Sequence, residues 1–160
     1  MSQFKQIFIG SDHNGFNLKN DLKAYLTQQG YQITDVGGEV LDPNDDFPEF
    51  AAKAATAVLT HDDAVAILIC GGGQGMCMAS NRFKGIRASL LWDEHEAKMT
   101  RNDNDANVAC LPGRILEQDF AKCQRIIDVF LQTPFGEGFI GHRHSLAICF
   151  KGYCRICAVE

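Results

Sequence analysis

The sequence has no run of basic residues and no long apolar stretch, and each absence excludes a class of protein. Its 160 residues include 15 Lys and Arg against 20 Asp and Glu, which gives a formal net charge of −5. Because a phosphate backbone is bound by clustered positive charge, we expect no nucleic-acid partner. No apolar run approaches the roughly 20 residues of a membrane-spanning helix, so we expect no membrane partner.

The marks of a secreted or multidomain protein are missing as well. Lys5 and Gln6 precede only a very short apolar run, which is not the pattern of a signal peptide. We find no internal repeat or low-complexity linker and expect a single domain over residues 1–160. The seven cysteines are an odd number, and several lie inside apolar runs. This usage favours a reduced, cytoplasmic protein.

Strand and helix patterns alternate along the whole chain. Buried strands are predicted near residues 6–10, 31–36, 64–70, 86–92 and 107–111. Helices are predicted near residues 14–30, 47–59, 74–83, 93–102 and 116–131, with Asn14 as the cap of the first helix. This order predicts an α/β fold, a single-domain doubly wound parallel sheet of about five strands in a Rossmann-like three-layer sandwich. A C-terminal helical tail is expected to follow it.

The most informative segment joins an apolar run to a glycine-dense turn. The run from Ala64 to Ile69 shows no alternation, so both of its faces should be buried. Cys70 ends the run, and Gly71, Gly72, Gly73, Gln74 and Gly75 follow it. Such glycines let backbone N–H groups approach an anion closely. A nucleophile or base beside an anion cradle indicates chemistry on a small phosphorylated or oxyanionic molecule.

Three loops that follow predicted strands should meet at one edge of the sheet. They are residues 11–13, residues 70–75 and the turn that leads to Arg114. Open α/β sheets bind their ligands at the carboxyl ends of the strands. The loops bring acid–base groups, a thiol and a cation to that edge in Asp12, His13, Cys70 and Arg114, which together form a candidate site.

A dinucleotide-binding loop is an alternative interpretation of the glycine turn. Asp93, at the end of the next predicted strand, stands where such loops have a ribose-binding acid. However, the spacing Gly-x-Gly-x-x-Gly is not met, because Met76 and Met78 occupy the two possible third positions. A nucleotide-dependent oxidoreductase is therefore kept only as a third function.

The remaining cysteines and acids have structural interpretations. A zinc site is the alternative for Cys154 and Cys157 in the tail, near His142 and His144, but apolar residues alternate with these cysteines. We therefore expect no metal and no cofactor. Packing roles are expected for three other cysteines, and a solvated turn and helix start for a pair of acids: Cys77, Cys110, Cys123, Asp45 and Asp46.

Taken together, these motifs resemble the B-type ribose-5-phosphate isomerase family, which includes the galactose-6-phosphate isomerase subunits. The resemblance runs to about Gly141. It rests on segments in the family's order: Gly10-Ser11-Asp12-His13, Asp46-Phe47-Pro48, Ile69 to Gly75 with Ala79 and Asn81, Gly85-Ile86-Arg87-Ala88, Asn104 to Val108, and Gly113-Arg114.

The resemblance implies an aldose–ketose isomerase that works through a cis-enediolate without a cofactor. It implies Cys70 as the base, the N–H groups of residues 71–75 at the enediolate, and Asp12 and Asn104 at the sugar hydroxyls. His13 and Arg114 would hold the phosphate. The implied assembly is a homodimer or a dimer of dimers with shared active sites, and we expect the tail, residues 141–160, at a subunit interface.

Three positions depart from the family pattern. Asp103 stands where the family has the histidine assigned to ring opening, and Gly72 stands where it has a hydroxyl. In the tail, Arg143 matches the first of two phosphate-binding arginines, and Ala147 stands at the second. Ribose 5-phosphate is the expected substrate. A six-carbon sugar phosphate, or a catalytically weakened member that binds a phosphosugar, remains the alternative.

Overall fold

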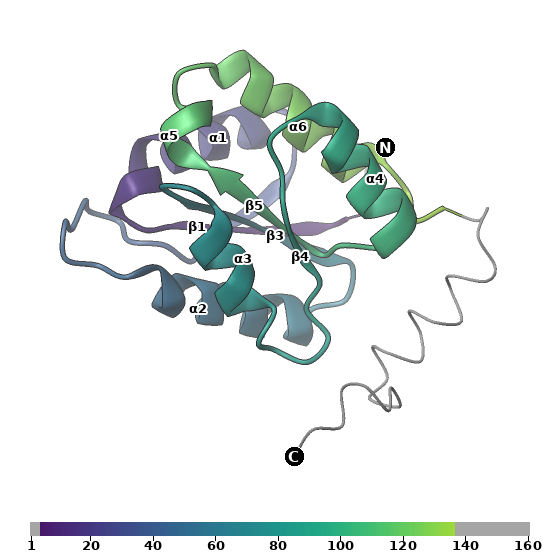
Figure 1. Ribbon diagram of the computed structural model, residues 1–160, viewed down its shortest axis with the longest axis horizontal. Helices are drawn as coiled ribbons and strands as arrows, with labels where there is room; N and C mark the ends of the chain where they lie inside the picture. The colour runs from purple at the N-terminus through teal and green to yellow at the C-terminus, as the bar shows by residue number, and fades with distance from the viewer. Residues whose placement is uncertain (1–3, 137–160) are drawn as a thin grey trace.

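Five short apolar segments pair as parallel strands in one sheet. The computed structural model describes residues 4–136, and the strand order is β2-β1-β3-β5-β4 (Figure 1). Residues of β3 are buried along its whole length, as its continuous apolar run predicts. The strands are β1 (Gln6–Ser11), β2 (Gln32–Asp35), β3 (Ala64–Cys70), β4 (Ala88–Leu90) and β5 (Val108–Pro112).

Helices cover both faces of the sheet and give the molecule three layers (Figure 1). On one face, α1 (Phe16–Gln28), α4 (Glu94–Asn104), α5 (Gly113–Leu116) and α6 (Phe120–Gln132) form a core with β1, β3 and β5. On the other face, α2 (Phe47–Thr60) and α3 (Gln74–Ser80) pack on the same strands. The predicted α/β fold with a doubly wound parallel sheet is confirmed.

The order of the strands reverses between β1 and β3. From β1 the chain steps outward to β2 and then returns to β3 on the other side of β1. In doubly wound sheets, such a reversal opens a crevice at the carboxyl ends of the two central strands. The loops that follow β1 and β3 therefore flank this crevice.

The first and the last predicted helices differ from the structure. Asp12 rather than Asn14 provides the first cap, because its side chain accepts a 2.9 Å hydrogen bond from the Asn14 N–H and begins a 3₁₀ turn, His13–Gly15, ahead of α1. The single helix predicted over residues 116–131 is divided into α5 and α6. The Asp119 side chain caps α6 by accepting a 3.0 Å hydrogen bond from the Lys122 N–H.

The edge strand and two helices also end at different residues from those predicted. β4 contains only residues 88–90, and it pairs on one side alone, with β5. α3 ends at Ser80 and α4 extends to Asn104. Between residues 4 and 136, no helix combines the length and apolar character needed to cross a bilayer. The predicted helical tail, residues 141–160, lies outside the described residues.

A buried lysine fixes the start of the loop that joins β2 to α2. The Nζ of Lys19 donates hydrogen bonds of 3.1 Å to Asp35 Oδ1 and 2.7 Å to the Gly38 carbonyl, and it is fully buried. Burial opposes the charge of Asp35, but hydrogen bonds from Lys23 and Lys19 outweigh burial and lower its pKa. This loop ends next to the site described below.

Candidate active site

The loop after β1 brings a carboxyl group to the crevice. Asp12 is 5% exposed, and its Oδ1 accepts the hydrogen bond from the Asn14 N–H. Burial, the largest influence, raises the pKa of Asp12 above its ordinary value, although the Asn14 N–H and the neighbouring His13 oppose that shift. A carboxyl group of this kind can exchange protons closer to neutral pH than an exposed one.

His13 lies between a carboxylate and a carboxamide. Its Nδ1 is 2.9 Å from Asp45 Oδ1, and its backbone N–H donates to the same oxygen at 2.8 Å. Its Nε2 is 2.7 Å from Asn14 Nδ2. The side-chain hydrogen bond with Asp45 is the main reason that the pKa of His13 is raised. His13 is therefore protonated to a higher pH than an isolated histidine.

The prediction that Asp45 belongs to a solvated turn is wrong. Its side chain is only 14% exposed and is paired with His13. The loop before α2 turns back toward the end of β1, which brings together two residues that are 32 positions apart. Patterns of neighbouring residues in the sequence do not predict a contact over this separation.

Cys70 ends β3 and is enclosed by the glycine turn. Cys70 is 5% exposed, and its Sγ accepts a 3.2 Å hydrogen bond from the Gly73 N–H. Gly73 has a φ of +76°, a left-handed conformation that is strained for residues with a Cβ. This conformation directs the Gly73 N–H at the sulfur, and a donor at that position stabilises negative charge there.

A cation and an aromatic ring lie against the same turn. The guanidinium of Arg114 is so close to Gly71 that a Cβ there would lie 2.9 Å from Arg114 Cζ. The Arg114 N–H donates to the Gly71 carbonyl at 3.2 Å, which joins α5 to the turn. The ring of Phe47 packs in the same way on Gly75, where a Cβ would lie 3.0 Å from the ring.

The structure brings most of the predicted residues to one edge of the sheet. The carboxyl ends of β1, β3 and β5 carry Asp12, His13, Cys70, residues 71–75 and Arg114. A hydrogen bond of 3.4 Å from Arg114 Nη2 to Asn14 Oδ1 connects two of the three loops. Asn14, Asp45 and Phe47 contact this cluster but were not predicted as site residues.

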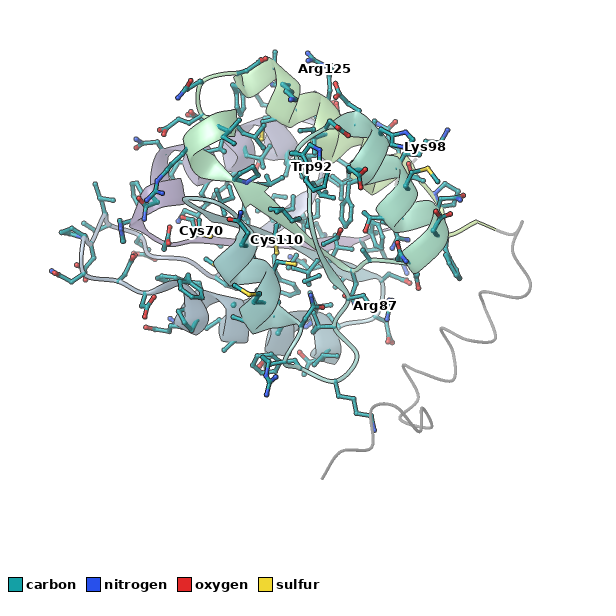
Figure 2. All side chains as sticks on the ribbon, in the orientation of Figure 1. Cys70, Arg87, Trp92, Lys98, Cys110 and Arg125 are labelled. Atoms are coloured by element: carbon teal, nitrogen blue, oxygen red, sulfur yellow. The ribbon has the colours of Figure 1, made fainter. Side chains whose placement is uncertain are left out.

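Asp103 and Asn104 lie at the opposite edge of the sheet from Cys70. They are the last residues of α4, and β5 begins only four residues later with Val108. Asn104 and Arg87 both line a cavity of about 240 Å³. Arg87 lies well away from Cys70 in Figure 2. Arg143 is outside the described residues.

The other cysteines differ in burial. Cys110 and Cys123 are fully buried, as packing residues are, and burial raises the pKa of Cys123 to about 12. Cys77 is half-buried, and a hydrogen bond with Cys110 is the main cause that lowers its pKa to about 7. Within residues 4–136, no three His, Cys, Asp or Glu side chains gather as metal ligands would. The tail residues considered for zinc lie outside that range.

Comparison with known proteins identifies the family. The family model described as Ribose/Galactose Isomerase matches residues 7–148. A probable ribose-5-phosphate isomerase B of Mycoplasma pneumoniae is 42% identical over 87% of this chain and 88% of that protein. A 4-deoxy-4-sulfo-D-erythrose isomerase of a Clostridium species is 39% identical over 82% of each chain.

Solved structures agree with the sequence comparison. The ribose 5-phosphate isomerase of Thermotoga maritima has a TM-score of 0.84 and 36% identity, over 91% of this chain and 97% of that chain. Ribose-5-phosphate isomerase B of Mycoplasma genitalium, solved with bound ribulose-5-phosphate, has a TM-score of 0.83 and 35% identity, over 92% and 95% of the two chains. The resemblance seen in the motifs is confirmed. The chain is an isomerase, and it belongs to the ribose/galactose isomerase family.

Proposed function

We propose that this isomerase interconverts ribose 5-phosphate and ribulose 5-phosphate through a cis-enediolate. The observation that carries the proposal is the Cys70 thiol at the strand-order reversal, with the glycine turn, His13 and Arg114 around it. The relatives named as ribose-5-phosphate isomerases support this substrate. Such an enzyme needs no cofactor, and we expect it to act in the cytoplasm, in carbohydrate metabolism by the pentose phosphate pathway.

In this mechanism, Cys70 moves one proton between two neighbouring carbons. As a thiolate it takes the proton from C2 of the open-chain aldose, and the C1 carbonyl oxygen gains negative charge. The N–H groups of residues 71–75 that face the sugar donate to the enediolate oxygens. The thiol then returns the proton to C1, and a proton passes from the C2 oxygen to the C1 oxygen. Asp12, a buried carboxyl with a raised pKa, supports this exchange at the hydroxyls.

The phosphate is held by cations at the end of the crevice in this proposal. The ring of His13 and the guanidinium of Arg114 lie on neighbouring loops, and each lies against the Asn14 carboxamide. A planar guanidinium donates two parallel hydrogen bonds to a phosphate, and an imidazolium adds a second positive charge beside it. From the tail, Arg143 would add a further cation.

Each active site is shared between two subunits in this proposal. Asp103 and Asn104 end α4 at the far edge of the sheet from Cys70, so one chain does not complete the site. A second copy would present its own Asp103 and Asn104 to the crevice, as a homodimer or within a dimer of dimers. Asn104 would bind the sugar hydroxyls, and Asp103 would take the place of a ring-opening base.

A second candidate substrate is a sugar that forms no ring. The relative named as a 4-deoxy-4-sulfo-D-erythrose isomerase acts, by its name, on a sugar whose C4 carries a sulfonate in place of a hydroxyl. Such a sugar has no C4 hydroxyl to close a furanose ring. Asp103, in place of the histidine assigned to ring opening, favours this candidate. A six-carbon sugar phosphate is a third candidate substrate, and a weakened protein that only binds phosphosugars is the candidate without catalysis.

A proton NMR assay in D₂O tests the proposal. Ribose 5-phosphate, allose 6-phosphate, galactose 6-phosphate and 4-deoxy-4-sulfo-erythrose are each incubated with the purified protein. We expect ketose formation and deuterium uptake at C2, fastest with ribose 5-phosphate. The Cys70→Ala variant should lose this exchange while it still binds the sugar phosphate, because the base alone is removed.

The Cys123→Ala variant is the matched control, since it removes the same thiol from a buried position on α6. It should keep the exchange. Full exchange by the Cys70→Ala variant would contradict the role of Cys70 as the base. No exchange by the wild-type protein with any of the sugars would favour a protein that binds phosphosugars without converting them.

A further inference from the structure

Gly72 and Gln74 share one space on the glycine turn. A Cβ built on Gly72 would collide with the Oε1 atom of Gln74, and it would lie 3.3 Å from Gln74 Cδ. The Gln74 side chain therefore folds back from the start of α3 over the turn. Its carboxamide occupies the position that a side chain of residue 72 would take.

This carboxamide is free to bind a ligand. Gln74 is exposed, and its amide makes no hydrogen bond to a protein group within residues 4–136. A carboxamide carries two donors and an acceptor, and either orientation of the amide presents one of these groups to the turn. An exposed glutamine is ordinarily solvated and has no fixed place, but this one lies against the turn that encloses Cys70.

The Gln74 amide lies among protein groups that are proposed to contact the substrate. Gly73, between the two residues, donates its N–H to Cys70 Sγ at 3.2 Å. The guanidinium of Arg114 covers the preceding residue, Gly71. The Gln74 amide thus adds a neutral donor to a turn that already carries a thiol and a cation. A neutral donor suits an oxygen that gains charge only during the reaction.

We propose that Gln74 is a further substrate-contacting residue, which donates an amide N–H to a sugar oxygen that becomes charged in the enediolate. The inference rests on the proposed isomerase function and goes beyond it. Gly72 and Gln74 act as a pair: the missing side chain at position 72 makes room for the carboxamide. In a chain with a hydroxyl-bearing residue at position 72, that hydroxyl would stand in the same place.

The test compares kcat, KM and thermal unfolding of the Gln74→Leu variant with those of the wild-type protein. Leucine keeps a side chain of similar size and removes every hydrogen-bonding atom. We expect kcat to fall by about tenfold or more, because a lost oxyanion donor acts in the transition state, with KM changed by less than about threefold. The melting temperature should not change, because the amide binds no protein group.

A rescue experiment separates the proposed contact from a structural role. Gly72→Ser in the Gln74→Ala background places a hydroxyl where the carboxamide was, and we expect it to recover part of the lost kcat. Met78→Leu is the matched control, since Met78 is exposed one turn further along α3, and it should leave kcat unchanged.

Each outcome decides the inference. A kcat of Gln74→Leu within twofold of the wild-type value overturns it, while the proposed function stands. A lower kcat that Gly72→Ser does not recover in the Gln74→Ala background overturns the shared position of the two residues. If the wild-type protein converts none of the sugars, the proposed function itself fails. The proposed role of Gln74 in the reaction then fails with it.

Discussion

At the scale of single residues, two hydrogen bonds position the groups of the proposed site. The Gly73 N–H donates to Cys70 Sγ, and the Asp45 carboxylate accepts from His13. The first places a donor against the sulfur of the proposed base, and the second favours an imidazolium at the phosphate. Asp45 is therefore a positioning residue that acts through His13.

As the pH rises, we expect the Asp45→Asn variant to lose its affinity for the sugar phosphate at a lower pH than the wild-type protein does. The hydrogen bond with Asp45 raises the pKa of His13, so wild-type His13 keeps its proton as the pH rises past the ordinary histidine pKa. With a neutral partner, the pKa of His13 falls, and the proton is lost earlier. A KM–pH profile should therefore rise at lower pH in the variant than in the wild type.

Glu39→Gln is the matched control for Asp45→Asn, because it removes one negative charge from an exposed position in the same loop. Its KM–pH profile should match that of the wild type. Identical profiles for Asp45→Asn and the wild type would show that His13 does not bind the phosphate in its protonated form.

Replacement of Arg114 by alanine should raise KM for the sugar phosphate by about tenfold or more, because a charged hydrogen bond contributes roughly 1.5–3 kcal/mol. Arg114→Lys should give an intermediate KM, since it keeps the charge without the planar fork. Steady-state kinetics of both variants measure the effect. Arg82→Ala, at an exposed site after α3, is the control. An unchanged KM in Arg114→Ala would place the phosphate elsewhere.

At the scale of elements, short capped helices and strand ends position the site. Asp12 caps the 3₁₀ turn that contains His13, and Asp119 caps α6 just after the short helix that carries Arg114. Each cap satisfies a backbone N–H that a helix start leaves unpaired. The loops at the crevice are therefore held by side chains within a few residues of the reacting groups.

Loss of the Asp119 cap should destabilise the protein by about 1 kcal/mol. The Asp119→Ala variant leaves the Lys122 N–H without its acceptor, whereas Asp119→Ser restores one and should recover most of the loss. Urea unfolding at a fixed protein concentration measures both variants. Equal unfolding midpoints for the alanine variant and the wild type would mean that water replaces the cap without cost.

Local patterns predict the sheet and the crevice, but not every boundary or contact. Continuous apolar runs and the glycine turn are visible in a few neighbouring residues, so the prediction of β3 with Cys70 at its end is correct. The break between α5 and α6 escapes prediction because Leu116 and Cys123, seven residues apart and both buried, keep the helical period across it. The contact of Asp45 with His13 depends on tertiary folding, which no local period encodes.

At the scale of the whole molecule, the sheet separates two sets of proposed site residues. One set, Asp12, His13, Cys70 and Arg114, lies at the carboxyl ends of strands, whereas Asn104 ends a helix that leads into the amino end of β5. Residues fixed at opposite edges of a rigid sheet do not meet by side-chain motion. Within the proposed function, a two-fold axis that brings a partner's α4 to the crevice joins them.

Subunit complementation tests this arrangement directly. We expect the Cys70→Ala and Asn104→Ala variants to be weakly active alone and to recover activity when co-expressed. In a mixed dimer, one crevice carries both changes and the other carries neither. Random pairing makes about half of the dimers mixed, so about a quarter of the wild-type activity should return.

A second mixture provides the control for complementation. His13 and Cys70 lie on the same chain's crevice, so a mixed dimer of His13→Ala and Cys70→Ala has one defect in each site and should recover nothing. Recovery in the first mixture alone requires that Asn104 serve the crevice of the other subunit. If neither mixture recovers activity, each chain forms its own site, and Asn104 acts from the far edge of the sheet without contact with the sugar.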